Sequence, residues 1–161
     1  MKEALFMEQF LPKVTTGPVD LDAAANTGER FDMQKFKRVA FIIVAAAGTT
    51  PDSHTVSLQQ HTVATSGTPA ALAIANPWFH KVNAETSFTK VDVDVAASSF
   101  DIDAIVGDTK FVAVFEVLQE NLTDGYRWVS LNMTDAGGAQ LGTVIAIGFD
   151  ATEKPTYGKV V

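Results

Sequence analysis

The sequence has no cysteine and few basic residues among its 161 positions. The lack of cysteine excludes a disulfide framework, thiolate chemistry and cysteine-ligated zinc. Twelve Lys and Arg against 19 Asp and Glu give a net charge of −7, which argues against a protein that binds nucleic-acid phosphates. With 47% hydrophobic and 19% charged residues, the composition is that of a folded domain and excludes a disordered chain.

Long hydrophobic runs are also missing. The longest, from Val39 to Ala47, is far shorter than the roughly 20 residues that a membrane-spanning helix needs. The N-terminal residues include Glu3, Glu8 and Lys13 and form no continuous apolar stretch, so we expect no signal peptide. These features predict a protein that is synthesised in a cytoplasm and has no membrane partner.

Short alternating segments, separated by Gly, Pro, Asn, Asp and Ser, run through most of the sequence, and helical periodicity is rare. This pattern is typical of all-β proteins. We predict one antiparallel β-sandwich domain, jelly-roll-like, with about eight strands. One helical turn is expected within 98–108. The expected strands are 29–33, 38–46, 54–62, 71–75, 88–95, 110–118, 126–133 and 141–149.

Two of these segments are apolar without alternation. Residues 38–46 predict a strand that is buried on both faces, and residues 110–118 predict a central strand. The sandwich domain is expected to span residues 29–149. An extended N-terminal arm, residues 1–28, is expected before it, and a polar tail, residues 150–161, after it.

The predicted arm contains four apolar side chains that are suited to act as anchors: Leu5, Phe6, Phe10 and Leu11. An arm with such anchors and no helix of its own has to dock on its own domain or on a neighbour, and docking on a neighbour is a common way to build an assembly. Trp78 and Phe79 directly follow Pro77 in a predicted loop, where exposed aromatic side chains commonly mark contact sites. The alternative is that Trp78 closes one open end of the sandwich. The candidate contact residues are Leu5, Phe6, Phe10, Leu11, Trp78 and Phe79.

No common motif for catalysis or cofactor binding occurs in the sequence: G-x-S-x-G, H-E-x-x-H, Walker A and G-x-G-x-x-G are all missing. The spacing of His54 and His61 places them on opposite faces of one predicted strand, which disfavours a shared metal. Asp92 and Asp94 share one face of a strand; they either attract Ca²⁺ or form a solvated face that discourages aggregation, and the second is the better default. We therefore expect no catalytic residue, no cofactor and no metal site.

A set of short motifs is distributed along the chain. They are SLQQH at 57–61, ANPWFHK at 75–81, FTKV at 88–91, VFEVL at 114–118 and GYRWVS at 125–130, with VDL at 19–21 and AAA at 23–25 in the arm. Together they resemble a family of small virion structural proteins of tailed bacteriophages, which are usually encoded near the capsid genes. The similarity extends from residue 5 to residue 149, and the polar tail falls outside it.

The resemblance implies a capsid decoration (cement) protein. Such a protein is not an enzyme; it binds the outer surface of the major capsid protein lattice and stabilises the head. The implied partner is the major capsid protein, with a homo-oligomer on the capsid exterior of the virion and synthesis in the cytoplasm of the bacterial host. A position at the head–tail junction or in the tail is an alternative hypothesis. A further alternative is a carbohydrate-binding β-sandwich module that uses Trp78, Phe79, Asp92 and Asp94.

Overall fold

The computed structural model describes residues 10–21, 26–49, 54–75, 77–82, 86–93, 97–134 and 137–151. Within these residues strands are joined by turns and loops, with two short 3-10 helices, η1 (Met33–Lys35) and η2 (Gln119–Asn121), and one helical turn, α2 (Asp103–Val106). The strands are β1 (Leu11–Asp20), β2 (Asn26–Thr27), β3 (Phe31–Asp32), β4 (Phe36–Ala45), β5 (Thr55–His61), β6 (Ala70–Leu72), β7 (Trp78–Lys81), β8 (Thr89–Lys90), β9 (Ser99–Asp101), β10 (Phe111–Leu118), β11 (Trp128–Met133) and β12 (Leu141–Ala151).

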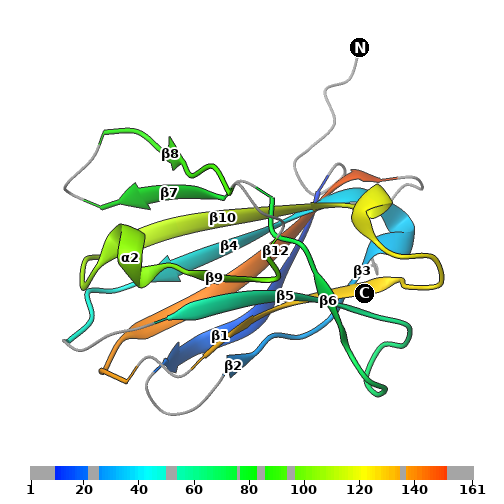
Figure 1. The fold of residues 1–161 in the computed structure, drawn as a ribbon, viewed down its shortest axis with the longest axis horizontal. Coiled ribbons are helices and arrows are strands. Elements are labelled where there is room, and N and C mark those ends of the chain that lie inside the picture. Colours follow the sequence, from blue (N-terminus) through cyan, green and yellow to red (C-terminus); the bar gives the residue numbers. More distant parts are fainter. Residues whose placement is uncertain are drawn as a thin grey trace, which may run out of the picture.

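The strands form two antiparallel sheets in a β-sandwich (Figure 1). Sheet A has the order β1-β12-β4-β10-β7-β8. Sheet B has the order β2-β11-β5-β6, with β3 also paired to β11 and β9 also paired to β5. Every pair of neighbouring strands is antiparallel. The predicted all-β sandwich is confirmed.

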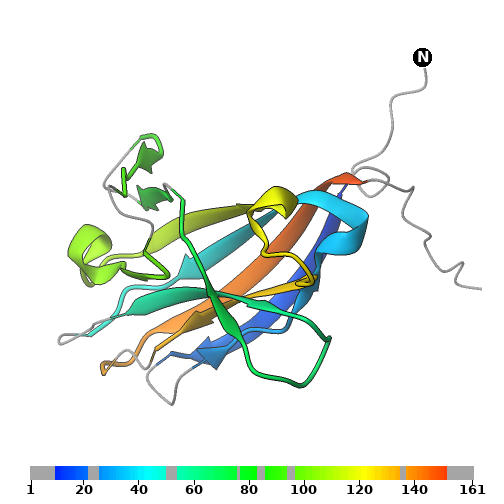
Figure 2. The ribbon, with the colours of Figure 1, turned by 45° about the vertical axis from the view of Figure 1, so that its right-hand side comes forward.

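The strand order is that of a jelly roll. Early strands pair with late ones, as β1 with β12, β2 with β11, β4 with β10 and β5 with β6, and successive pairs belong alternately to sheet A and sheet B. This is the arrangement that a long antiparallel hairpin adopts when it is rolled up into two Greek keys. The described residues form twelve strands, more than the predicted number of about eight, and two strands of this roll, β1 and β2, lie outside the predicted set. The remaining strands are additions, because β3 follows β2 along β11, β9 pairs with β5, and β7 and β8 extend sheet A beyond β10 (Figure 2).

The hydrophobic core lies between the two sheets. Along β4, β10 and β12 every second side chain points inward, and Phe41, Ile43, Phe115 and Val144 are completely buried there. Phe115 also packs edge-on against the ring of Phe79 from β7, with the ring centroids 5.9 Å apart. The alternation that defines a strand therefore fixes which residues of these segments form the core and which face outward.

Most of the predicted N-terminal arm belongs to the sandwich, which corrects the boundary at residue 29. Residues 11–20 form β1 at the edge of sheet A, and the following Leu21 is completely buried. The sequence conceals this strand because Pro12 and Pro18 interrupt it and because its register with β12 shifts twice, between Val14 and Thr16 and between Thr16 and Val19. Proline and bulges are tolerated at an edge, where one side of the strand needs no partner.

Three other predictions are corrected by the structure. β12 continues to Ala151, past the expected start of the tail at 150. Of the strand expected over 88–95, the described residues 88–93 contain only β8, and the N–H of the following Val91 donates to the carbonyl of Pro77. Trp78 and Phe79 lie in β7 and not in a loop. The helical turn expected within 98–108 is confirmed as α2.

A close contact at Gly28 provides a test of the sheet B edge. The N–H of Gly28 donates to the Asn132 side chain at 3.0 Å, and a Cβ at this position would lie 2.2 Å from the backbone oxygen of Leu131. We expect Gly28→Ala to lower the free energy of unfolding by about 1–3 kcal/mol, because the backbone of β11 has to move. Gly17→Ala is the matched control, since a Cβ there meets nothing within 4 Å, and it should change stability by less than about 0.5 kcal/mol. Urea denaturation of both variants measures the difference, and equal stabilities would contradict the contact.

Candidate protein-contact surface

The outward side of sheet A is the most unusual surface of the molecule. We define the outer face of sheet A by the residues of β1, β12, β4, β10 and β7 that alternate with the inward-pointing core residues. They are Pro12, Val14, Arg38, Ala40, Ile42, Val44, Trp78, His80, Val112, Val114, Glu116, Leu118, Leu141, Thr143, Ile145, Ile147 and Phe149. Most of these side chains are aliphatic or aromatic.

One row of this face is apolar across its whole width. The strand registers place Val14, Ile145, Ile42, Val114 and Trp78 side by side, one from each of five neighbouring strands. Side chains at directly opposed positions of antiparallel strands are about 5 Å apart and contact one another. The row is therefore a continuous hydrophobic ridge that runs perpendicular to the strands.

Several side chains of this face remain exposed to solvent. The exposed fraction is 54% for Val14, 42% for Val44, 40% for Trp78 and 62% for Leu141. An antiparallel sheet commonly packs one face on the core and presents polar residues on the other. Residues 38–46 were predicted to be buried on both faces, and this is wrong for the outward side of β4, since the described residues leave Val44 exposed. A large exposed apolar area on a folded domain typically marks a contact with another protein.

Charge on the outer face of sheet A lies at its margins, with the largest cluster at one end. The Arg38 guanidinium lies 3.8 Å from the carboxylates of both Glu116 and Asp150. It also lies 4.9 Å from the centroid of the Phe149 ring, a cation–π geometry. Phe10 packs edge-on against the same ring, with the centroids 5.0 Å apart. This end of the face thus combines aromatic surface with an ion-pair cluster of one cation and two carboxylates.

The structure brings two of the predicted contact residues to the outer face of sheet A and separates the others. Phe10 rests on Phe149 at one side of the face, and Trp78 ends the apolar row on β7. Leu11 packs against the core. Phe79 is 1% exposed and stacks on Phe100, so its assignment as a contact residue is corrected: it follows Trp78 in a strand and points to the opposite side. Leu5 and Phe6 lie outside the described residues.

Most residues of the outer face were missed as contact candidates. Ile42, Val114 and Ile145 were each assigned to strands, and the lack of polar alternation in their segments was the available signal. A segment without alternation predicts two apolar faces, and the strand registers are needed to show that neighbouring segments join their outward residues into one surface. Prediction from aromatic residue type therefore identified the margins of the surface and not its centre.

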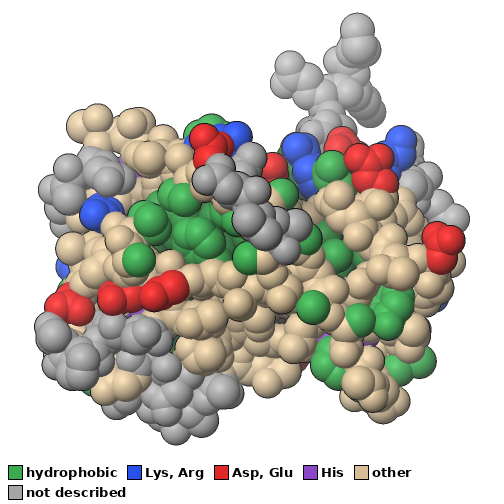
Figure 3. Space-filling model, in the orientation of Figure 1, with side chains coloured by type: hydrophobic (Ala, Val, Ile, Leu, Met, Phe, Trp, Pro, Cys, Tyr) green, Lys and Arg blue, Asp and Glu red, His purple; other side chains and the backbone are tan. Residues whose placement is uncertain are grey.

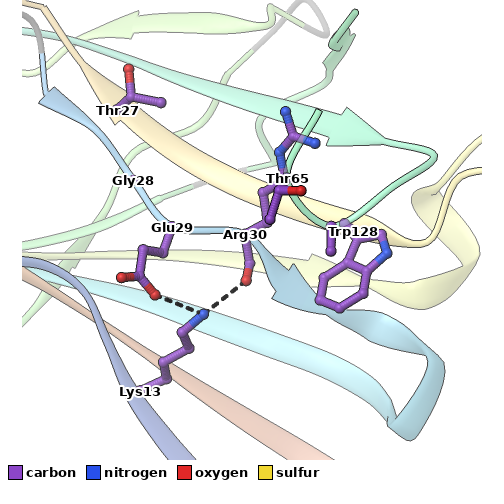
Figure 4. Close-up of a pocket in the computed structure, with 8 residues that line it drawn as sticks. Lys13, Thr27, Gly28, Glu29, Arg30, Thr65 and Trp128 are labelled. Atoms are coloured by element: carbon purple, nitrogen blue, oxygen red, sulfur yellow. Dashed lines mark hydrogen bonds and ion pairs between the residues drawn. The ribbon is translucent and has the colours of Figure 1, made fainter. Parts of the chain in front are cut away.

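The outward side of sheet B is polar by contrast. Its central strands present Ser57, Gln59 and Asn132, among others, and it borders a pocket of about 580 Å³ next to Trp128 (Figure 4). Within this pocket the ammonium of Lys13 lies 3.0 Å from the carboxylate of Glu29 and donates to a backbone carbonyl. The two charges thus neutralise each other, and the pocket wall links β1 to the segment that connects β2 and β3.

A buried histidine, His61, ends β5 on this side of sheet B, next to the loop that follows β5. His61 is 4% exposed, and its Nε2 lies 2.9 Å from the Oγ of Ser130. The guanidinium of Arg30 holds the loop by donating to the carbonyls of Val63 and Ser66, both at 2.7 Å. Burial, and secondarily the charge of Arg30, lowers the pKa of His61 below its ordinary value. Ser130 is 1% exposed, so this Ser–His pair is closed to a substrate and is best explained as part of the packing.

The candidate metal and carbohydrate residues that the structure describes do not form one site. Asp92 is ion-paired with Lys90 at 3.2 Å, and Asp94 lies outside the described residues. In the part of the chain that the structure describes, no group of three or more His, Cys, Asp and Glu side chains is arranged to hold a metal ion. Trp78 and Phe79 point to opposite sides of sheet A and do not form one aromatic platform for a sugar.

A further apolar patch is visible where the two sheets diverge. In Figure 3 hydrophobic side chains gather between β7 and β5, over β10 and β9. From the segments in this region, Val91, Phe100 and Ile105 are partly buried and pack against the core. The ring of Phe100 lies 5.6 Å from that of Phe79 and 6.4 Å from that of Phe115, so we interpret the patch as the margin of the core.

The sequence matches no protein-family model, and no curated protein matches it. None of the helices in the described segments has the length and hydrophobicity that crossing a membrane requires. The functional interpretation consequently depends on the surfaces described above and on the motifs of the sequence.

The buried histidine predicts a pH dependence of stability. Because the pKa of His61 is lowered in the folded protein, the unfolded chain binds a proton more readily, and stability is lost as the pH falls through the ordinary histidine pKa of 6.5. We expect the free energy of unfolding to decrease between pH 7.5 and pH 5, and His61→Gln to reduce this decrease. His80→Gln, at a half-exposed position, is the matched substitution for comparison. Urea denaturation at several pH values measures both, and an unchanged slope in His61→Gln would refute the assignment.

Proposed function

We propose that this protein is a non-enzymatic structural protein of a tailed-phage virion, a capsid decoration (cement) protein. In this function it binds the outer surface of the major capsid protein lattice and stabilises the head, as a homo-oligomer on the capsid exterior. The proposal combines the motif resemblance of the sequence with the character of the exposed surfaces. It assigns no catalytic residue, cofactor or metal.

The observation that carries the proposal is the apolar outer face of sheet A. The exposed side chains of Val14, Val44 and Leu141 serve no purpose in the fold of the single domain, and they are suited to a contact with protein. Phe10 and Trp78, two residues selected from the sequence as contact residues, lie at opposite sides of this face. A function in an assembly explains why this surface is retained.

Three physical properties support a place on a particle surface. A jelly roll is a rigid scaffold, and this architecture occurs in viral capsid proteins, although a fold alone does not define a function. Many copies on one particle convert weak individual contacts into strong collective attachment. The net charge of −7 limits nonspecific binding to nucleic acid and favours solubility.

Immunogold electron microscopy of virions from the source, with an antibody against this chain, tests the proposal. Label spread evenly over the head is expected for a cement protein. Label confined to the neck or tail would replace it with the alternative of a head–tail junction or tail component. If no particle carries label, the virion function is wrong.

Substitutions at the margins of the outer face should separate attachment from folding. Phe10→Ala removes the ring that packs on Phe149, and Trp78→Ser removes the exposed indole of β7. We expect each change to reduce the number of copies per particle several-fold, because aromatic side chains dominate the energetics of protein contacts. The melting temperature should fall by less than about 4 °C, since neither side chain is fully buried. Quantitative gels of purified particles measure occupancy, with Gln59→Ala on sheet B as the control; a Phe10→Ala protein that melts far below wild type would instead place Phe10 in the core.

A further inference from the structure

We propose that the outer face of sheet A is the contact surface between two copies of this chain, which pack face to face as a homodimer. The inference rests on the proposed function, which treats this face as a protein-contact surface, and it identifies the partner as a second copy of the chain. Charge, shape and area are the three observations on which the assignment to a second copy is based.

The charge distribution allows two acidic chains to meet at this face. Each chain has a net charge of −7, which opposes association in general. The residues that define the outer face of sheet A include one cation, Arg38, and one anion, Glu116, and these two are neighbours at 3.8 Å. Further charges lie at the margins of the face, namely Asp150 beside Arg38, Asp20 opposite Leu141 and Lys90 opposite Trp78, whereas the centre around Ile42 is apolar. Two copies that approach through this centre bring no charge into contact there.

The shape of the face is matched by its own copy. β-Sheets have a right-handed twist, and a twisted sheet packs well on another sheet of the same twist, at about −30° and about 10 Å separation. The two sheets of this domain already pack face to face, with side chains such as Ile43 and Leu131 in the core between them. The aliphatic residues on the outward side of β4, β10 and β12 are of the same type as those on the inward side, so a second sheet A is a suitable partner.

The size of the face fits a dimer that dissociates on dilution. The 17 outward positions that define the face, each about 4.8 Å by about 6.8 Å, give a patch of about 550 Å². Two such patches bury about 1,100 Å² in total, just above the roughly 1,000 Å² that a specific interface has to exceed. The hydrophobic ridge centred on Ile42 occupies the middle of the patch, where the residues that dominate binding energy are usually found.

The first experiment measures the oligomeric state of the full-length protein by sedimentation equilibrium. We expect a dimer of twice the chain mass of 17.2 kDa that dissociates on dilution. Ile42→Lys places a charge at the centre of the ridge and should raise the dissociation constant at least about 30-fold. Gln59→Lys is the matched control, because it introduces the same side chain on an outward position of a central strand of sheet B, and it should leave the dimer intact. Circular dichroism and melting curves verify that both variants fold.

The second experiment uses the lack of cysteine in the natural sequence. In the single-cysteine variant Ile42→Cys, maleimide should react slowly at high protein concentration and fast on dilution, because the second copy covers the thiol only in the dimer. Gln59→Cys should react at a rate that does not depend on concentration.

The two experiments also distinguish other occupants of the face. A monomer at all concentrations with a freely reactive Ile42→Cys would overturn the proposal and leave the face to a different protein, such as the capsid protein. A thiol that stays protected in the monomer would also overturn it, because a segment of the same chain then covers the face. A dimer that is insensitive to Ile42→Lys would place the dimer contact elsewhere and refute the inference. These results are obtained without virions, so failure here is separate from an absence of immunogold label on particles.

Discussion

The pairing of β4 with β12 on one side and β10 on the other is the constraint on which the rest of the structure depends. β4 is in register with β10 from Arg38 to Ala45 and with β12 from Arg38 to Ala45 as well, so three long strands are aligned at the centre of sheet A. Their side chains point alternately to the two faces of the sheet. One set, with Phe41 and Val144, builds the core, and the other set is left on the outside with the same aliphatic character. The stability of the domain and its exposed apolar face thus have a common origin.

The two sheets consequently give the molecule two chemically different sides. Sheet A is apolar outside, with its largest cluster of charges around Arg38, whereas sheet B presents Ser57, Gln59 and Asn132 on its central strands. The buried His61–Ser130 pair and the loop held by Arg30 belong to the second side. When two such domains pack through sheet A, as proposed, the apolar sides are covered and the two polar sides stay outside.

The fold was predictable from the sequence to the extent that local pattern decides it. The segments 110–118 and 141–149 agree closely with β10 and β12, because long apolar runs bounded by polar turns leave few alternatives. β1 was not predictable, since Pro12, Pro18 and two register shifts remove the alternation that identifies a strand. The contact surface was only partly predictable. Trp78 was identified by its type, but the row through Ile42 exists only through the registers of five strands, which a local pattern does not encode.

The edges of sheet A determine whether an assembly can grow by adding strands to the sheet. On one side the sheet ends in β1, whose prolines and irregular register offer a poor template for another strand, and on the other side it ends in the two-residue β8. A neighbour therefore finds little backbone with which to continue the sheet, and growth into an open fibre is disfavoured. Contacts through the face can close on themselves under two-fold symmetry, so the proposed dimer would be a finite, closed assembly.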